Sequence, residues 1–431
     1  MGRPDGSRWF YSYIPYGMAG GATSALIPLF AHALGGGLAE VGIIAAATSI
    51  ASVPAFILWG VLSDRLGRRK PFLLLGFGGT AACFAAMAWA ASMPAFYLAN
   101  LLIGFLASAG GPVGAVLVME TSDRKQWPSR LALLSRVGGI GWVAGLSLGV
   151  AWLAVGSVPL TEMGAMRSLF VVGAVLSGVA GVLGAVWLRE PAVKVERRDV
   201  ALVDFHPRIE RVKFLPMRLL YFIDPRPRPG RSARLPRPLR VYLGSVFLLF
   251  TGFTAFYAFF PIFLKEAYGF GSADIFAVYI ASHVASAVAY GSVARWIASR
   301  GSRPMQVYAS LARGALFPSF LALAILPFPV LVRFPLALVL HAGIGLCWAV
   351  LNVAGNTLVS KLAPERGRAE ALGAYNATQG VGSIAGPLLG GFAAQSLGYP
   401  SAFGLAVAFV VGGAIVLRLD AQPEGASPRS H

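Results

Sequence analysis

The sequence predicts an all-α integral membrane protein that crosses the membrane about twelve times. Of its 431 residues 56% are hydrophobic and only 13% are charged, a composition that excludes an ordinary water-soluble globule. Apolar stretches recur along almost the whole chain, each about as long as the ~20 residues that a helix needs to cross the hydrocarbon core. The alternating segments of about 10 residues that build a membrane β-barrel are not found.

These apolar stretches define the expected spans. They cover residues 10–35, 39–62, 71–91, 94–119, 129–155 and 168–188, and then 241–264, 273–297, 305–326, 335–358, 369–394 and 401–417. The first stretch is longer than the apolar core of a cleavable signal peptide, so we expect it to remain as the first helix. Cys83 and Cys347 fall inside spans, which indicates small packing residues rather than a disulfide or a metal site.

The distribution of basic residues predicts the orientation. Loops after even-numbered spans, together with the adjoining span ends, carry 27 of the 36 Lys and Arg residues, whereas loops after odd-numbered spans carry only Arg167, Lys265 and Arg333. Because basic loops are retained in the cytoplasm, we expect both termini there and the protein in the cell (plasma or inner) membrane. The net charge of +18 is then a signal of topology and of contact with the membrane surface, not of nucleic-acid binding.

A polar stretch divides the spans into two sets of six. We expect a six-helix bundle in residues 1–190, a cytoplasmic linker rich in Arg and Pro in residues 191–239, and a second six-helix bundle in residues 240–431. Within the linker, residues 211–223 mix basic and large apolar side chains. This segment either lies on anionic lipid headgroups or is a disordered tether.

The two halves also look like a repeat. Gly60 begins a pattern at the end of the second span, and Gly291 begins a similar one 231 residues later, at the end of the eighth. The fifth and eleventh spans align at an offset of 241, which matches three glycines in each: Gly141, Gly145 and Gly149 with Gly382, Gly386 and Gly390. Duplicated helical halves around a central site are a transporter architecture.

The loop from Gly60 to Arg69 combines glycines with charges. Gly60 and Gly67 permit close helix packing and a tight turn. Asp64 can pair with cations, while Arg68 and Arg69 hold the loop at the membrane surface. A basic loop that serves topology alone explains the arginines but not the acid or the glycines.

This pattern resembles the signature that the major facilitator superfamily of secondary transporters carries between its second and third helices, here Gly60, Asp64, Arg65, Gly67, Arg68 and Arg69. The resemblance implies two pseudo-symmetric six-helix bundles and a cytoplasmic latch between this loop and the start of the eleventh helix. Glu365 and Arg368 stand there as partners, and Glu120, at the end of the fourth helix, is expected to accept Arg68.

The segment Gly382–Gly391 resembles a glycine-proline motif that drug-proton antiporters of the family carry on the fifth helix. In this chain it lies on the eleventh helix, and Leu146 stands where the fifth helix would have proline. Glycines spaced by four residues let helix backbones touch. The motif therefore supports close packing more than antiport.

Polar residues inside spans are costly in lipid and are candidates for substrate binding or ion coupling. Asn100 stands where many proton-coupled relatives have an arginine, and His341 falls on it at the offset of 241. His283 and His341 are the groups deep in spans that can exchange a proton near neutral pH. For each histidine, a hydrogen bond between helices with no transport role is the alternative reading.

Two arginines and several amides complete the candidates. The resemblance implies that the fifth helix lines the cavity and that the ninth lies at the periphery. Arg136, on the fifth helix, is therefore expected to meet an anionic group, whereas Arg313, on the ninth, is expected to reach lipid or its headgroups. The amides and two of the aromatic residues are further candidates for the cavity wall: Asn352, Asn356, Asn376, Gln379, Tyr16 and Tyr257. For the amides, bonding between helices is again the alternative. The resemblance implies that the first and seventh helices line the cavity, so their aromatic residues are expected to give it an aromatic character: Tyr11, Tyr13, Phe253, Phe256, Phe259 and Phe260.

Three functional hypotheses follow. The first is a proton-coupled exporter of small drug-like molecules that works by alternating access. The second is a facilitator or symporter of an organic anion, with Arg136 in the site. The third is a receptor that resembles a transporter, or a lipid-modifying enzyme, but no paired carboxylates, nucleophile constellation or metal-ligand cluster falls in the spans, so we expect no enzymatic activity, catalytic residue, metal or cofactor. The expected partners are a small-molecule substrate and anionic lipid near the linker, with no nucleic acid, and we expect a monomer.

Overall fold

The computed structural model describes residues 8–123, 126–156, 160–190, 235–364 and 368–419. Every regular element in these ranges is a helix. The first half contains η1 (Arg8–Ser12), α1 (Tyr13–Ser24), α2 (Leu26–Ala33), α3 (Leu38–Leu66), α4 (Lys70–Trp89), α5 (Met93–Ala107), α6 (Gly110–Glu120), α7 (Trp127–Gly156) and α8 (Glu162–Trp187). The second half contains α10 (Arg237–Tyr268), α11 (Ser272–Arg300), α12 (Ser302–Ile325), α13 (Val330–Leu362) and α14 (Arg368–Leu419). Nine of the described helices are long and apolar enough to cross a membrane.

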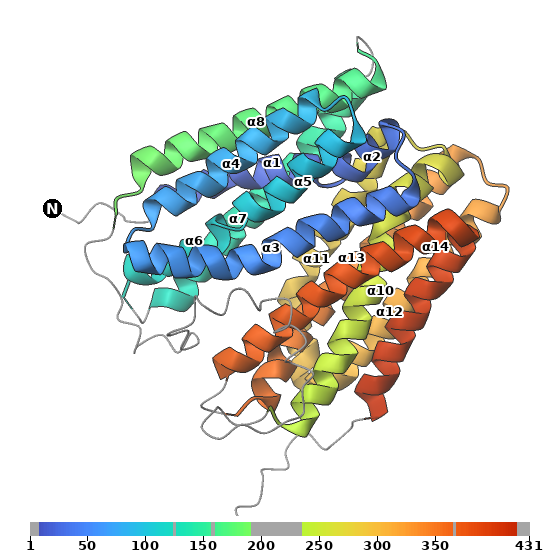
Figure 1. The fold of residues 1–431 in the computed structure, drawn as a ribbon. Coiled ribbons are helices and arrows are strands. Elements are labelled where there is room, and N and C mark those ends of the chain that lie inside the picture. Colours follow the sequence, from blue (N-terminus) through green and yellow to red (C-terminus); the bar gives the residue numbers. More distant parts are fainter. Residues whose placement is uncertain (1–7, 124–125, 157–159, 191–234, 365–367, 420–431) are drawn as a thin grey trace, which may run out of the picture.

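The described helices make twelve passes, as the sequence predicts. Two spans are each built from two shorter helices, since α1 continues into α2 and α5 continues into α6. The opposite holds for α14, whose 52 residues contain two passes. The chain turns back at Gly398, which has φ 79° and ψ 171°, a conformation that residues with a side chain rarely adopt. Figure 1 shows the two red passes of α14 running in opposite directions.

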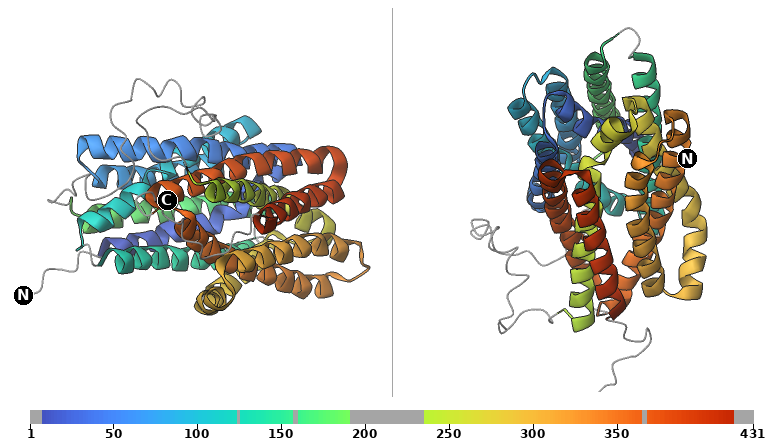
Figure 2. Two further views of the ribbon diagram at one scale, coloured as in Figure 1. Left: turned by 90° about the horizontal axis from the view of Figure 1, so that it is seen from below. Right: turned by 90° about the vertical axis from the view of Figure 1, so that its right-hand side faces the viewer.

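The helices form two pseudo-symmetric bundles of six passes. Helices α1 to α8 gather in one bundle and α10 to α14 in the other (Figures 1 and 2). The pairing of neighbours repeats: α1 with α7 corresponds to α10 with α14, α3 with α5 to α11 with α13, and α4 with α8 to α12 with α14. Most of the expected linker, residues 191–234 with the segment 211–223, lies outside the described residues.

Glycines bring the corresponding helix pairs into backbone contact. A Cβ atom added at Gly141 or Gly145 on α7 would collide with the backbone of α1, at Ile14 and Met18. Gly386 on α14 would collide in the same way with Thr251 on α10. The prediction that these glycines serve close packing is confirmed, and the contacts correspond as the repeat requires.

The aromatic residues of the seventh span mainly form core. Phe256, Phe259 and Phe260 on α10 are fully buried, and the ring of Phe256 stacks on that of Phe317 at 4.0 Å and 3°. The expectation that these three phenylalanines line a solute cavity is therefore wrong. Helix α10 packs chiefly against α14, and rings from α12 and α14 cover these phenylalanines.

The two bundles are joined at the end opposite the loop Gly60–Arg69. We call that loop the signature loop, and its end of the molecule the signature end. At the opposite end, Nε2 of His32 lies 3.1 Å from Oε1 of Glu266, and Nζ of Lys265 lies 2.7 Å from Oε1 of Glu162. Toward the signature end, α3 and the first pass of α14 diverge (Figure 1).

Candidate functional site

A pocket of about 150 Å³ lies inside the second bundle. Residues from α10, α12, α13 and α14 line it: Val246, Leu249, Phe250, Phe253, Gln306, Trp348, Leu351, Asn352, Asn356, Tyr375, Asn376 and Gln379. Five of these side chains are amides and four are aromatic, while none is charged. We call it the amide pocket. Such walls can stack against a flat apolar solute and also hydrogen-bond its polar groups.

The amide pocket unites several residues that the sequence singled out. Asn352, Asn356, Asn376 and Gln379 all line it. Nδ2 of Asn356 also donates to the backbone carbonyl of Asn352 at 2.9 Å. Both residues lie on α13, so this bond is within one helix and is not the bond between helices that was the alternative.

Other lining residues were missed by the sequence analysis. Gln306 and Trp348 were not distinguished from ordinary residues of their spans, although an amide inside an apolar span was a usable signal for Gln306. Oε1 of Gln306 accepts a hydrogen bond from the hydroxyl of Tyr242 at 3.1 Å. This bond holds the amide at the pocket wall.

His341 lies deeper in the second bundle and is fully buried. Its Nδ1 is 2.7 Å from the carbonyl oxygen of Val278, and its Nε2 is 3.3 Å from the hydroxyl of Tyr257. A carbonyl only accepts, so Nδ1 carries the hydrogen and Nε2 accepts from Tyr257. A neutral ring satisfies both contacts, which is the interhelical arrangement named as the alternative reading.

His283 and Arg136 occupy different surroundings. The ring of His283 on α11 lies 6.4 Å from that of Trp142 on α7, so this half-buried histidine sits where the two bundles meet. Arg136 on α7 is exposed and does not line the amide pocket.

Asn100 and Tyr16 are placed within the first bundle. Asn100 is fully buried, and its Nδ2 donates to the carbonyl of Phe96 at 2.9 Å. The hydroxyl of Tyr16 lies 3.4 Å from Oγ1 of Thr80. Neither residue lines the amide pocket.

Arg313 on α12 faces the interior of the second bundle and is only 3% exposed. Its guanidinium carbon lies 4.1 Å from the centre of the Phe253 ring, and between 5.7 and 5.8 Å from those of Tyr257, Phe317 and Trp348. The prediction that Arg313 reaches lipid or its headgroups is therefore wrong. Helix α12 turns this face toward α10 and α13, which the apolar character of the span could not reveal.

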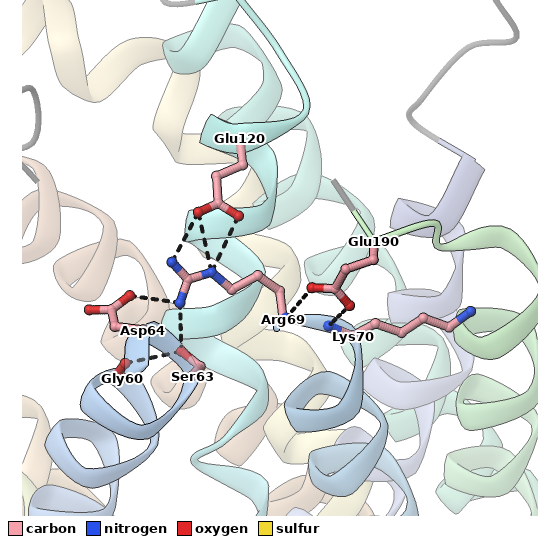
Figure 3. Close-up of polar contacts among 7 residues, drawn as sticks. All are labelled: Gly60, Ser63, Asp64, Arg69, Lys70, Glu120 and Glu190. Atoms are coloured by element: carbon pink, nitrogen blue, oxygen red, sulfur yellow. Dashed lines mark hydrogen bonds and ion pairs between the residues drawn. The ribbon is translucent and has the colours of Figure 1, made fainter. Parts of the chain in front are cut away.

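The signature loop is held by a buried ion-pair cluster around Arg69 (Figure 3). Nη1 of Arg69 lies 2.6 Å from Oδ1 of Asp64 and 2.9 Å from Oγ of Ser63. Its Nη2 donates to Oε1 of Glu120 at 2.9 Å, and its backbone N–H donates to the carboxylate of Glu190. The cluster thus ties the ends of α3, α4, α6 and α8 together.

The charge of Arg69 is stabilised by its acidic neighbours. Burial on its own lowers the pKa of the guanidinium, but the hydrogen bonds and charges of Glu120 and Asp64 outweigh burial, and the net effect raises the pKa. Gly67 adopts φ 60° at the C-terminus of α3 and allows the turn that brings Arg69 back toward Asp64.

The expected partner of Glu120 was the wrong arginine. Arg68 is exposed, whereas Arg69 precedes α4 and points inward to Glu120. Glu190 was missed because it follows the sixth span directly and reads as part of the linker. Glu365 and the side chains of Arg65 and Arg368 lie outside what the structure describes, so the latch to the second bundle remains a prediction.

Comparison with known proteins agrees with this architecture. The family model of the Major Facilitator Superfamily matches residues 9–378 and 312–431. A variant of the nucleoside transporter NupG superposes with a TM-score of 0.75 at 15% identity, covering 96% of this chain and 99% of that one. The human organic anion transporter MFSD10 gives a TM-score of 0.60 at 18% identity, covering 96% of this chain and 100% of that one. A bacterial homolog of the human lysosomal transporter Spinster, in an inward-facing and occupied conformation, gives 0.70 at 13%, covering 98% and 97%.

One curated relative is similar in sequence over a shorter stretch. The class C tetracycline resistance protein of Escherichia coli is 32% identical over 148 residues, which are 34% of this chain and 34% of that protein. The match therefore spans about a third of the relative's length.

Proposed function

This chain belongs to the major facilitator superfamily, and from that premise we propose that it exports small drug-like organic solutes across the cell membrane in exchange for protons. The observation that carries the proposal is the amide pocket, whose wall combines aromatic rings with amides and has no charged side chain. A flat, moderately apolar solute with several polar groups fits this chemistry better than a sugar or an ion. The local similarity to a tetracycline resistance protein supports the same solute class.

Alternating access is the proposed mechanism. The ion pairs of Glu162 with Lys265 and of His32 with Glu266 join the bundles at the opposite end, while the bundles diverge toward the signature end (Figure 1). We assign the signature end to the cytoplasm because the basic loops lie there. Solute then enters the pocket from the cytoplasm, and release requires these contacts to break and the signature end to close.

Proton coupling is assigned to His283 rather than to His341. His283 lies between the bundles, where a change of charge alters their contact, and it is half-buried. His341 is fully buried with both ring nitrogens engaged by Val278 and Tyr257, so protonation there would disrupt the core.

The test uses sealed proteoliposomes that contain a pH-sensitive dye. Tetracycline, a hydrophobic cation and an organic anion are added in turn to wild type, His283→Ala and His341→Asn. Asparagine keeps an N–H donor for the carbonyl of Val278, so His341→Asn serves as the matched control. We expect tetracycline to evoke proton flux in wild type and in His341→Asn, and none in His283→Ala.

Other outcomes separate the alternatives. Uptake of tetracycline without any proton flux would overturn coupled export and leave a facilitator. Flux evoked only by the organic anion, and lost in Arg136→Gln, would favour the organic anion transporter instead.

A further inference from the structure

Arg313 is a buried cation that has no carboxylate as an ion-pair partner among the described residues. It lies near the middle of α12 and is 3% exposed. Within the described residues its Nε and Nη1 atoms have no hydrogen-bond partner, and no ion pair joins it to a carboxylate. Donors at these two nitrogens therefore remain available.

The aromatic rings around Arg313 compensate its charge only in part. The faces of Phe253, Phe317 and Trp348 attract the cation through their π-electrons. Such rings do not replace the strong acceptors that the guanidinium has in water, and an uncompensated charge inside a span is costly. An anionic acceptor would satisfy the free donors of Nη1 with a charge-assisted hydrogen bond, which neutral rings cannot supply.

Arg313 adjoins the inner end of the amide pocket. Phe253 and Trp348 contact its guanidinium and also line the pocket. Gln306, another lining residue, stands seven residues before Arg313 on α12 and so lies on the same face of that helix. Two rings thus separate the unpartnered donors from a cavity that already has amides at its wall.

We propose that Arg313 forms an anion-binding site at the inner end of the amide pocket and takes the carboxylate of a small aromatic solute. The aromatic body of that solute stacks between Phe253 and Trp348, and its other polar groups bond to the amides. This inference rests on the proposed transport function for its biological role. It narrows the solute class to aromatic acids and zwitterions, and it places the anion in the second bundle rather than at Arg136.

Benzoate and benzamide provide a matched test of this site. A cavity of about 150 Å³ can hold one benzene ring, and the two probes share their size but differ in charge. Binding of radiolabelled benzoate is measured on the purified full chain in lipid nanodiscs, with no gradient, and unlabelled benzamide competes. We expect benzamide to bind roughly 10- to 100-fold more weakly, the range of a charge-assisted hydrogen bond.

Two variants locate the charge that binds benzoate. Arg313→Gln should weaken benzoate binding by the same factor and leave benzamide binding unchanged. Arg136→Gln, the matched control, should change neither. If Arg313→Gln is not monodisperse, Arg313→Lys replaces it, and we expect an intermediate loss because lysine keeps the charge but not the planar donor array of arginine.

Three results would overturn the inference. They are equal binding of the two probes to wild type, no binding of benzoate, and loss of binding in Arg136→Gln instead of the Arg313 variant. Failure of the site is distinguishable from failure of the proposed function, because the binding assay needs no transport. Benzoate binding at Arg313 without any solute flux in proteoliposomes would support the anion site and contradict the proposed export.

Discussion

Oε1 of Glu162 lies 2.7 Å from Nζ of Lys265 and so joins α8 of the first bundle to α10 of the second. The same oxygen accepts a hydrogen bond from Oγ of Ser272, at the start of α11. Both charged side chains are partly exposed, at 48% and 29%, so the pair is screened by water and contributes less than about 1 kcal/mol. A weak contact of this kind suits a surface that has to open and close.

We expect Glu162→Ala to increase the fraction of molecules that are open at the end opposite the signature end by up to about fivefold. Spin labels are placed at Leu160 and Phe328, which are exposed and lie in different bundles. Double electron–electron resonance then measures the distance between the two labels. The labels are placed in a chain without its native cysteines.

The control for Glu162→Ala is Asp274→Ala. Asp274 accepts from the backbone N–H of Gly271 within the second bundle only. It therefore should not change the distance between the labels. An equal change in both variants would mean that Glu162 does not hold the bundles together.

Arg69→Ala should lower the free energy of unfolding by roughly 3–5 kcal/mol, because Glu120 would keep a buried charge without its partner. The side chain of Glu120 is 2% exposed and that of Arg69 is 11% exposed. Arg68→Ala, one residue away and exposed, should change it by less than about 0.5 kcal/mol. The midpoint and denaturant dependence of unfolding in detergent measure the difference. Similar losses of unfolding free energy in both variants would show that Arg69 does not hold the cluster together.

The contribution of Arg69 should not depend on pH in the physiological range. The pKa of Arg69 is raised, so the stabilisation is fully present below its ordinary, strongly alkaline pKa and is lost only as pH rises through the higher folded-state value. The difference between wild type and Arg69→Ala should therefore be constant between roughly pH 6 and 9. A loss within that range would mean that another group titrates in the cluster.

The number and order of the spans could be predicted because lipid imposes a minimum apolar length on each helix. Their ends could not, since helices continue beyond the apolar stretch. The sixth span was expected from residue 168, but α8 begins at Glu162 and includes Arg167. The guanidinium of Arg167 donates to the carbonyls of Ala88 and Ala90, so this charge is used within the bundle.

The site was only partly predictable because it depends on which way each helix faces. Amides inside spans were recognisable by their cost in lipid, and Asn352 and Gln379 do line the pocket. Arg313 was placed in the lipid because α12 was taken as a peripheral helix. The choice between Arg68 and Arg69 depends on one turn of backbone at Gly67, which composition does not determine.

Gly145→Ala should destabilise the first bundle by roughly 1–3 kcal/mol, the usual cost of overpacking. The added Cβ atom would collide with the backbone of Met18 on α1, which cannot move without separating two helices. Gly139→Ala on the same helix has open space and should be neutral or slightly stabilising. Thermal unfolding of the two variants in detergent measures the contrast, and equal effects would show that the α1–α7 contact is not close enough to exclude a methyl group.

Asn376→Leu tests whether solute occupies the amide pocket. Asn376 is exposed on α14 and lines the pocket, so its amide is available to a solute. Leucine is of similar size but cannot hydrogen-bond, and losing one such bond should raise the KM for tetracycline export by about 5- to 10-fold. The maximal export rate of Asn376→Leu should equal that of wild type, because a bond that is equally strong in the ground and transition states affects only KM.

Ser396→Ala is the control for Asn376→Leu. Ser396 is exposed on the same helix and bonds only to the carbonyl of Phe392 at 2.7 Å, outside the pocket. Its KM should match that of wild type, and both variants should unfold within about 0.5 kcal/mol of wild type. A KM unchanged by Asn376→Leu, with normal export, would place the transported solute elsewhere between the bundles and leave the amide pocket as a packing defect of the second bundle.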